Sequence, residues 1–535
     1  MSSSPASSPP YGAVATLEFE NDSTIPSTKG DYYILPGQTL KFGRDTQSND
    51  YSFDSIEFSR NHLEFYSIII DEEAESMVYV RDRQSANGTF VNGILIGRGN
   101  GITPGRLLEH RDVVTSKANW HFRVRLLEMK RAPLNGIQLA EAKFFSDQYS
   151  ISDVVLGSGA STTVRLGHDV KTGQQLACKV YNLRERWEKD LRGQIAAIIH
   201  TVNLTKRLDH PNISSLKCAY KSRHTLFVFE ELAAGGDLFS LVCGSIRLAE
   251  LEIRWILRQV LSGLKYLHAK SIAHRDIKLE NVLLCDCPNP AHRMALTDFG
   301  HAEVVPKGGS ISRTAGTPGW QAPELFQRSG SLGVAVDMWS MGIMTVQLLI
   351  GSSESKMMAK IEQTLLAKAH IKALDFKDIF NEIYEVRHEC GLDGSPRENF
   401  IRRCLDCDPN TRMTVDEALK HPYINEPASL RQQFETSEQE TNAGWKSRVA
   451  EVEIRNLPDV VAPPSTSTIG KKEKANPNSS VAVKKSLLKK DIETLRSPYF
   501  KVTKSLGVKR ARVDETTNEV ESRAKRTKLV MKKTT

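Results

Sequence analysis

Three short polar motifs follow one another in the middle of the chain, and they constrain its fold more than any other feature. The first is His-Arg-Asp-Ile-Lys-Leu-Glu-Asn at 274–281, the second is Asp-Phe-Gly at 298–300, and the third is Ala-Pro-Glu at 322–324. Aspartates, a lysine and an asparagine thus recur within a short stretch. Oxygen ligands beside a lysine suit the binding of an anionic group together with a metal counterion.

The order and spacing of these motifs match the protein-kinase signature set. Residues 149–424 therefore resemble a eukaryotic-type Ser/Thr protein kinase domain. The resemblance implies a two-lobed α+β fold that uses ATP and Mg²⁺. It also implies catalytic roles: Asp276 accepts the proton of the substrate hydroxyl and Lys278 neutralises the γ-phosphate. Asn281 and Asp298 are expected to ligate Mg²⁺.

The residues expected to bind ATP begin ahead of these motifs. Leu-Gly-Ser-Gly at 156–159 allows the backbone to lie against phosphate oxygens, because glycine has no Cβ. Lys179 stands in an apolar strand, where burying a lysine is costly unless an anion accompanies it. The full expected ATP-binding set is Leu156, Gly157, Ser158, Gly159, Val164, Ala177, Lys179, Glu230, Glu231 and Asp298.

Two departures from the family pattern concern the partner of Lys179. The family places a glutamate nine residues before the histidine of a His-Pro-Asn motif, which is His210 here, and Thr201 occupies that position. Glu230 stands at the back of the expected ATP pocket, where an apolar or amide side chain is usual. We predict that the Glu230 carboxylate approaches Lys179 and replaces the missing partner. The alternative is a weakened kinase, or a pseudokinase scaffold that transfers no phosphate.

Further roles follow from the resemblance. Arg275 beside the catalytic aspartate implies control by a phosphorylated activation segment, because the arginine needs an anion partner. The candidate phosphorylation sites are Ser310, Ser312, Thr314 and Thr317. Glu324 and Arg412 resemble a buried ion pair of the C-lobe, and Asp337 resembles the residue that supports the catalytic loop.

Two acidic residues near the expected active site suggest a substrate preference. Asp237 and Glu280 would together favour Arg or Lys a few residues before the phosphoacceptor. The alternative is that Asp237 only contacts the ribose of ATP.

Residues 12–130 are predicted to be all-β. Short alternating runs recur there, and two apolar arms flank Asn-Gly at 92–93, which favours a hairpin. Phe-Gly-Arg at 42–44, Ser-Arg-Asn-His at 59–62 and the run at 82–93 occur in the order found in forkhead-associated (FHA) domains. This resemblance implies a β-sandwich that binds phosphothreonine through Arg44, Ser59, Arg60 and Asn87, with His62 as a structural brace. The alternative is a sandwich that has lost phosphate binding.

Three segments lie outside the two predicted domains. Residues 1–11 are rich in Ser and Pro and are expected to be disordered, residues 131–148 are expected to form a linker, and residues 425–535 are expected to form a disordered basic tail. From 470 to 535 there are 19 Lys/Arg and 7 Asp/Glu, against a net charge of +8 for the whole chain. Such basic clusters suit an import receptor or nucleic-acid phosphates. A chromatin-binding protein that uses this tail, or a merely solubilising tail, is the alternative.

An FHA domain followed by a kinase domain resembles the checkpoint-effector kinases, and most of all the fungal meiosis-specific FHA kinases. The resemblance implies a nuclear Ser/Thr kinase in checkpoint, DNA-damage or meiotic recombination signalling, recruited by a phosphothreonine on an adaptor protein. Recruitment would allow self-association and phosphorylation in trans. No apolar run is long enough for a membrane span, so no membrane partner is expected.

Overall fold

The structure is a computed structural model of the 535-residue chain. It describes residues 9–21, 28–69, 76–99, 103–116, 120–127, 129–158, 162–183, 191–243, 248–289, 291–307, 310–312, 316–326, 332–351, 395–443, 445, 447 and 452–460. Gly159, Thr314, residues 1–8 of the expected N-terminal disorder and residues 461–535 of the expected tail lie outside this set. No helix of the described residues is both long and apolar enough to cross a membrane.

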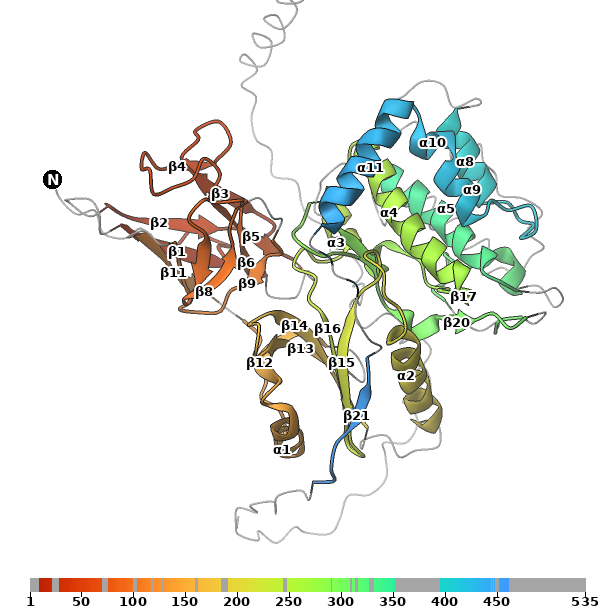
Figure 1. The fold of residues 1–535 in the computed structure, drawn as a ribbon, viewed down its shortest axis with the longest axis horizontal. Coiled ribbons are helices and arrows are strands. Elements are labelled where there is room, and N and C mark those ends of the chain that lie inside the picture. Colours follow the sequence, from red (N-terminus) through yellow and green to blue (C-terminus); the bar gives the residue numbers. More distant parts are fainter. Residues whose placement is uncertain are drawn as a thin grey trace, which may run out of the picture. The chain divides into compact units, whose positions relative to one another are not determined.

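Two antiparallel sheets form the N-terminal β-sandwich, as expected (Figure 1). The first sheet has the order β2-β1-β11-β10-β7-β8, with bounds β1 Ala15–Asn21, β2 Thr28–Ile34, β7 Thr89–Val91, β8 Ile94–Gly97, β10 Val113–Thr115 and β11 Trp120–Leu126. The second has the order β4-β3-β5-β6-β9, with bounds β3 Thr39–Gly43, β4 Tyr51–Ser52, β5 Leu63–Ile68, β6 Met77–Asp82 and β9 Arg106–Leu107. Strands β3 and β4 are the one parallel pair among them.

An aromatic core joins the two sheets. Phe42 and Phe65 from the second sheet pack with Phe122 from the first, at ring-centroid distances of 5.0 and 5.2 Å. Aromatic side chains bury a large apolar area at little cost in side-chain entropy. The predicted hairpin is confirmed: Asn92 and Gly93 join β7 to β8 with φ of 50° and 80°, the left-handed conformation that Asn and Gly tolerate. The core therefore holds the sandwich while its loops carry the polar motifs.

The kinase N-lobe is built on a further sheet, separate from the two sheets of the sandwich. Its strands are β12 Tyr149–Ser158, β13 Thr162–Asp169, β14 Gln175–Asn182, β15 Leu216–Lys221 and β16 Thr225–Glu231, in the order β12-β13-β14-β16-β15, and helix α2 (Leu191–Thr205) lies between β14 and β15 in the chain. Strands β14 and β16 are neighbours, with Ala177 opposite Glu230 and Lys179 opposite Val228. Lys179 and Glu230, both from the expected ATP-binding set, therefore lie on adjacent strands.

The C-lobe is mainly helical. Its elements are α3 Leu238–Cys243, α4 Glu250–Ala269, β17 Ile272–Ala273, η2 Leu279–Asn281, β18 Val282–Leu284, β19 Met294–Leu296, η3 Phe299–His301, β20 Glu303–Val304, η4 Pro323–Phe326, α5 Ala335–Ile350, α8 Pro396–Cys404, α9 Val415–Lys420 and α10 Pro422–Asn425. Helix α4 buries the apolar positions that its sequence repeats at helical spacing, among them Ile253, Ile256 and Val260. The hairpin β18–β19 presents the polar motifs beside this core.

The segment predicted to be a linker, 131–148, contains a helix and a 3₁₀ turn. Helix α1 (Gly136–Ala142) begins at an Asn135 capping box and is followed by a 3₁₀ turn at Lys143–Phe145. Phe145 is fully buried and stacks on Tyr220 at 4.4 Å. The Ser222 hydroxyl donates to Glu141 at 2.5 Å. One buried aromatic ring and one buried polar contact thus attach the segment to the N-lobe.

The predicted start of the disordered tail at residue 425 is wrong, because ordered elements continue beyond that residue. Helix α11 (Ala428–Asn442) follows α10, and its Leu430 and Phe434 pack on Trp255 of α4. Strand β21 (Ile454–Asn456) then adds to the N-lobe sheet in parallel with β15, as Figure 1 shows. Leu430 and Phe434, four positions apart, supply the apolar contact of this otherwise polar helix, and Glu438 pairs with Arg258 of α4 at 3.1 Å.

Candidate active site and phosphothreonine site

The catalytic loop is held by one buried aspartate. The Asp337 carboxylate accepts the backbone N–H groups of His274 at 2.9 Å and Arg275 at 2.7 Å, and it pairs with His268 Nε2 at 2.9 Å. Arg275 has φ of 67°, a conformation that a non-glycine residue adopts only when its surroundings enforce it. The prediction that Asp337 supports the catalytic loop is confirmed by these contacts.

Asp276 is the centre of a four-residue polar cluster. Its Oδ2 accepts from Asn281 Nδ2 at 2.9 Å and lies 2.9 Å from Lys278 Nζ, while its Oδ1 accepts from the Thr317 hydroxyl at 2.6 Å. Burial raises the pKa of the Asp276 carboxyl, but the charge of Lys278 and the Thr317 hydrogen bond outweigh burial and leave the pKa below its ordinary value. Asp276 is therefore ionised at neutral pH.

Thr317 has a place in this cluster that the sequence did not reveal. Its hydroxyl donates to Asp276 and accepts from Lys278 Nζ at 2.7 Å, and its backbone N–H donates to Asp276 at 3.1 Å. A phosphate on this hydroxyl would remove the hydrogen bond that Thr317 donates to Asp276 and would place an anion beside that carboxylate. Thr317 thus connects the activation segment to the catalytic loop.

One cavity collects most of the expected ATP-binding residues. It is lined by the apolar side chains of Leu156, Val164, Ala177 and Leu283 and by the polar residues Lys179, Glu230, Glu231, Asp237, Glu280 and Thr297. Gly157 and Ser158 lie on the neighbouring β12–β13 hairpin and do not line it. The Glu231 side chain, which lines this cavity, also pairs with Arg293.

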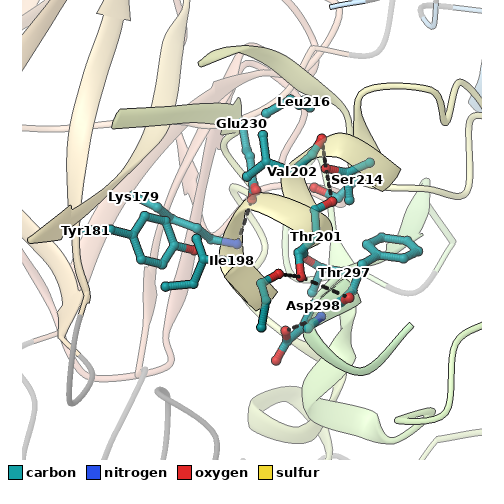
Figure 2. A pocket seen from close by; sticks show the side chains of 14 residues that line it. Lys179, Tyr181, Ile198, Thr201, Val202, Ser214, Leu216, Glu230, Thr297 and Asp298 are labelled. Atoms are coloured by element: carbon teal, nitrogen blue, oxygen red, sulfur yellow. Dashed lines mark hydrogen bonds and ion pairs between the residues drawn. The ribbon is translucent and has the colours of Figure 1, made fainter. Parts of the chain in front are cut away.

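The predicted contact between Lys179 and Glu230 is present (Figure 2). Lys179 Nζ lies 2.8 Å from Glu230 Oε2, with side chains 17% and 19% exposed. The pair is diagonal across neighbouring antiparallel strands, a separation that long side chains span readily. A cation in this sheet therefore has a carboxylate partner that comes from strand β16.

The helix that would carry the usual partner of Lys179 offers no substitute. Helix α2 has the sequence LRGQIAAIIHTVNLT, so no acidic residue within Leu191–Thr205 could take that place. The Thr201 hydroxyl instead donates to the Ala197 carbonyl at 3.0 Å. Thr201, Lys179, Glu230 and Asp298 line one cavity behind the ATP pocket.

Asp298 begins the Asp-Phe-Gly motif in a strained backbone conformation. Its φ and ψ are 59° and 74°, and its Oδ1 accepts from the Gly300 N–H at 3.2 Å. The Phe299 ring packs on His274 at 4.9 Å, and both are buried. Backbone strain of this kind is retained at functional sites, and it directs the Asp298 carboxylate toward the cavity that Lys179 lines.

Arg275 already has an anion partner without phosphorylation, which corrects the reasoning from the sequence. Its Nη1 lies 2.5 Å from Glu303 Oε2 and donates to the Ser312 carbonyl at 2.8 Å, while the Ser312 N–H donates to the same Glu303 carboxylate at 3.0 Å. Ser310 accepts the Leu332 N–H at 2.8 Å. A phosphate on Ser312 would thus compete with the Glu303 carboxylate for Arg275.

The expected C-lobe ion pair is present. Arg412 donates to both oxygens of Glu324, at 2.6 and 2.8 Å, and both residues are buried. The bidentate geometry fixes the third motif against the segment that precedes α9.

Asp237 and Glu280 both line the ATP cavity. Burial raises the pKa of Asp237 to about 6, although the Ser240 N–H donates to its carboxylate at 2.7 Å. Burial also raises the pKa of Glu280, and the nearby charge of Asp237 adds to this effect. A cation that binds beside these two acids would favour their ionised forms.

The expected phosphothreonine-binding residues come together on three loops of the sandwich. The Arg44 N–H donates to the Ser59 carbonyl at 2.9 Å, and the Ser59 hydroxyl accepts the Ala86 N–H at 2.9 Å. Asn87 Nδ2 reaches the Glu57 carbonyl at 3.4 Å. The side chains of Arg44 and Arg60 are exposed, so two guanidinium groups, a hydroxyl and an amide share one end of the domain.

Residues beneath these loops hold them in position. His62 is buried, burial lowers its pKa to about 4, and its Nδ1 accepts the Ser59 N–H at 3.1 Å, which fits a neutral structural brace. Asp82, which the sequence did not single out, accepts the Ser85 hydroxyl at 2.6 Å and the Thr89 hydroxyl at 2.7 Å. The hydroxyl groups of Ser85 and Thr89 both need a hydrogen-bond acceptor, and this need is the sequence signal that could have indicated Asp82.

Comparisons with known proteins agree with this geometry. Residues 151–424 match the protein kinase domain family, and residues 40–115 match the FHA domain family. The chain is 31% identical over 404 residues to the meiosis-specific serine/threonine-protein kinase mek1 of Schizosaccharomyces pombe, which covers 73% of this chain and 83% of that protein. It is 29% identical over 444 residues to the meiosis-specific serine/threonine-protein kinase MEK1 of Saccharomyces cerevisiae, with coverage of 77% and 86%.

Among solved structures, the crystal structure of Rad53 1-466 in complex with AMP-PNP matches with a TM-score of 0.40 and 25% identity. The match covers 77% of this chain and 100% of the Rad53 chain.

Proposed function

Because the chain belongs to the protein kinase family and carries an FHA domain ahead of a Ser/Thr kinase domain, we propose that Asp276 and its neighbours transfer phosphate from ATP to Ser or Thr of protein substrates, and that phosphothreonine on an adaptor protein brings the kinase to them. The observation that supports the proposal most is the Asp276 cluster, which joins a carboxylate, an ammonium group and two hydrogen-bond donors in one buried site.

The cluster accounts for phosphoryl transfer to a hydroxyl. The hydroxyl oxygen forms a bond to the γ-phosphorus, the bond from that phosphorus to the ADP oxygen breaks, and Asp276 takes the hydroxyl proton. Lys278 lies 2.9 Å from Asp276, where its charge would stabilise the transferred group. Lys179, held by Glu230, would orient the α- and β-phosphates.

The site also fits Mg²⁺. Asn281 donates through Nδ2 to the Asp276 carbonyl at 2.7 Å, which turns its amide oxygen away from that carbonyl, and Asp298 contributes a carboxylate. Amide and carboxylate oxygens are the ligands that Mg²⁺ prefers. When bound, the ion would neutralise charge on the phosphates.

The FHA domain supports the recruitment half of the proposal. Arg44 and Arg60 are exposed beside Ser59 and Asn87, and charge-assisted hydrogen bonds from arginine suit a phosphate dianion. Asn87 would contact the peptide backbone beside the phosphothreonine.

Replacing Arg44 by Ala tests recruitment. We expect at least a tenfold loss of affinity for a phosphothreonine peptide, because a charge-assisted contact to phosphate is lost, and unchanged activity on a free peptide substrate. Fluorescence anisotropy with a labelled peptide measures the binding. Arg123→Ala, an exposed arginine on β11, is the matched control. Equal binding by the Arg44 variant and the control would contradict the assigned site.

The names of the two relatives support a meiotic role. We place the protein in the nucleus, in meiotic recombination or checkpoint signalling, with the basic clusters after residue 470 as the contact for an import receptor. Recruitment of several copies to one adaptor would raise their local concentration and favour phosphorylation in trans.

We further propose that Asp237 and Glu280 select substrates with Arg or Lys upstream of the phosphoacceptor. In Glu280→Gln we expect the preference for an arginine peptide over its alanine analogue to fall about fivefold. The preference should also fall as the pH drops through about 6, because Asp237 then gains a proton and loses its charge. Steady-state kinetics on the two peptides measure both effects. An equal rise in KM for ATP with both peptides in Asp237→Asn would instead assign that residue to the ribose.

A further inference from the structure

Three side chains of the FHA domain line the nucleotide cavity. Ile68 at the end of β5, and Met77 and Tyr79 on β6, share this cavity with Lys179 and Glu230. All three side chains are buried, at 6%, 9% and 2% exposure. The pocket in which the kinase would hold ATP therefore has a wall that does not come from the kinase domain.

Apolar packing continues from this wall onto the segment that joins the two kinase lobes. Tyr66, Ile68, Met77, Tyr79 and Leu107 of the FHA domain form one buried cluster with Val154, Leu156, Val164, Leu166 and Ala234 of the kinase. Gly236 has φ of 76°, and a Cβ there would lie 3.0 Å from Ile68 Cγ2. The FHA face formed by β5, β6 and β9, here called the cap face, thus packs directly on the edge of the pocket.

Hydrogen bonds fix the cap face in place. The Tyr66 hydroxyl donates to the Ala234 carbonyl at 2.8 Å, and the Gly105 N–H donates to the Asp286 carbonyl at 2.7 Å. The side-chain amide of Gln175 pairs with both backbone groups of Leu107, at 2.8 and 2.9 Å. These bonds connect the FHA domain to both lobes of the kinase, because Gln175 belongs to β14 and Asp286 to the segment after β18.

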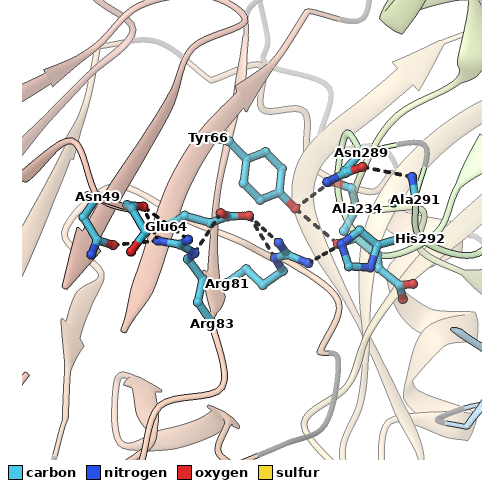
Figure 3. A network of polar contacts seen from close by, with 11 residues as sticks. Asn49, Glu64, Tyr66, Arg81, Arg83, Ala234, Asn289, Ala291 and His292 are labelled. Atoms are coloured by element: carbon cyan, nitrogen blue, oxygen red, sulfur yellow. Dashed lines mark hydrogen bonds and ion pairs between the residues drawn. The ribbon is translucent and has the colours of Figure 1, made fainter. Parts of the chain in front are cut away.

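A polar network extends from the cap face to the proposed phosphothreonine site (Figure 3). Arg81 contacts His292 of the kinase at 3.1 Å and pairs with Glu64 at 2.6 Å, and Glu64 also lies 3.4 Å from Arg83. Arg83 donates to Asn49 at 2.6 Å, and Asn49 Nδ2 donates to the Arg60 carbonyl at 2.8 Å. One continuous set of contacts therefore connects the cap face to the loops that carry the proposed phosphothreonine site.

We propose that the FHA domain is an intramolecular cap on the nucleotide pocket, so that nucleotide enters and leaves only when the cap face moves off the kinase. The inference rests on the proposed function in that the pocket is taken to be the ATP site. Side chains that line a pocket from outside the domain restrict access to it, and the same contacts must break for the pocket to open. The cap thus makes nucleotide exchange depend on the position of the FHA domain.

The test weakens the cap face without altering the pocket lining. Tyr66→Phe combined with Gln175→Ala removes four hydrogen bonds between the domains in the full chain, two from the Tyr66 hydroxyl and two from the Gln175 amide. We expect the association rate constant of a fluorescent N-methylanthraniloyl-ADP, measured by stopped flow, to rise about tenfold, since each lost bond shifts the opening equilibrium severalfold. Tyr51→Phe on β4 and Gln433→Ala at an exposed position of α11 are the matched controls, and we expect the wild-type rate in both.

Two results would overturn the cap. Equal association rates in the double variant, the controls and the wild type would exclude it while leaving the kinase assignment intact. Failure of every variant to bind the nucleotide, the opened one included, would overturn both the cap and the proposed function. Hydrogen exchange gives a second readout: the Gly105 amide, which donates to the Asp286 carbonyl across the interface, should exchange faster in the double variant than in the two controls, and unchanged protection would also count against the cap.

Discussion

Replacing Asp276 by Asn is expected to lower kcat by about a thousandfold, since positioned proton acceptors contribute roughly 10² to 10⁴ in rate. The carboxylate is buried, and Lys278 and the Thr317 hydroxyl counteract the burial that would otherwise raise its pKa. It is therefore ionised and ready to accept the substrate proton. Asparagine can still bond Asn281 and Thr317, but it cannot take that proton, so the loss falls on the chemical step.

Phosphotransfer to a basic peptide measures this loss. The KM for ATP and the affinity for a phosphothreonine peptide should stay near the wild-type values, because Asp276 lies outside the cavity that the nucleotide-binding residues line and outside the FHA domain. Asp408→Asn, in an exposed turn of the C-lobe, is the matched control. Turnover within tenfold of wild type in Asp276→Asn would exclude Asp276 as the proton acceptor.

Replacing Glu230 by Gln is expected to lower kcat/KM for ATP by about 100-fold. A 100-fold loss corresponds to about 2.7 kcal/mol of transition-state stabilisation, which lies within the roughly 1.5–3 kcal/mol that a hydrogen bond to a charged group contributes. Glutamine keeps the size of the side chain but not its charge, and α2 has no acid to replace it. Lys179 would then lose the contact that points it toward the phosphates.

Measurement of nucleotide affinity by fluorescence titration separates this effect from unfolding. The thermal midpoint of Glu230→Gln should change little, because the pair lies on the border of a cavity rather than in the core. Glu440→Gln, at an exposed glutamate on α11, is the matched control. An equal loss in both variants would exclude a specific role for Glu230.

The sequence allowed the Lys179–Glu230 contact to be predicted because strands β14 and β16 are neighbours in this fold and residues on them alternate in a regular way. The anion partner of Arg275 could not be found in the same manner. Glu303 reaches it through the short pairing of β17 with β20, which has no signature in the linear sequence.

Segments outside the two domains were harder to predict. Helix α11 is attached mainly through Leu430 and Phe434, and so few apolar positions in a polar stretch resemble a disordered tail. The linker holds one deeply buried ring, Phe145. The cap face was invisible for a different reason: the apolar residues of β5 and β6 are consistent with burial in the sandwich, and nothing in the sequence says that Ile68 and Tyr79 face another domain.

The central claim is that this is an active kinase in which Glu230 has taken over the role of the missing acid on α2. The most direct measurement is kcat/KM for ATP in wild type, Glu230→Gln, and Glu230→Gln combined with Thr201→Glu, because Thr201 and Lys179 line the same cavity. We expect the single variant to lose about 100-fold and the double variant to recover at least tenfold of that loss. Wild-type kinetics in Glu230→Gln, or no recovery in the double variant, would contradict the claim.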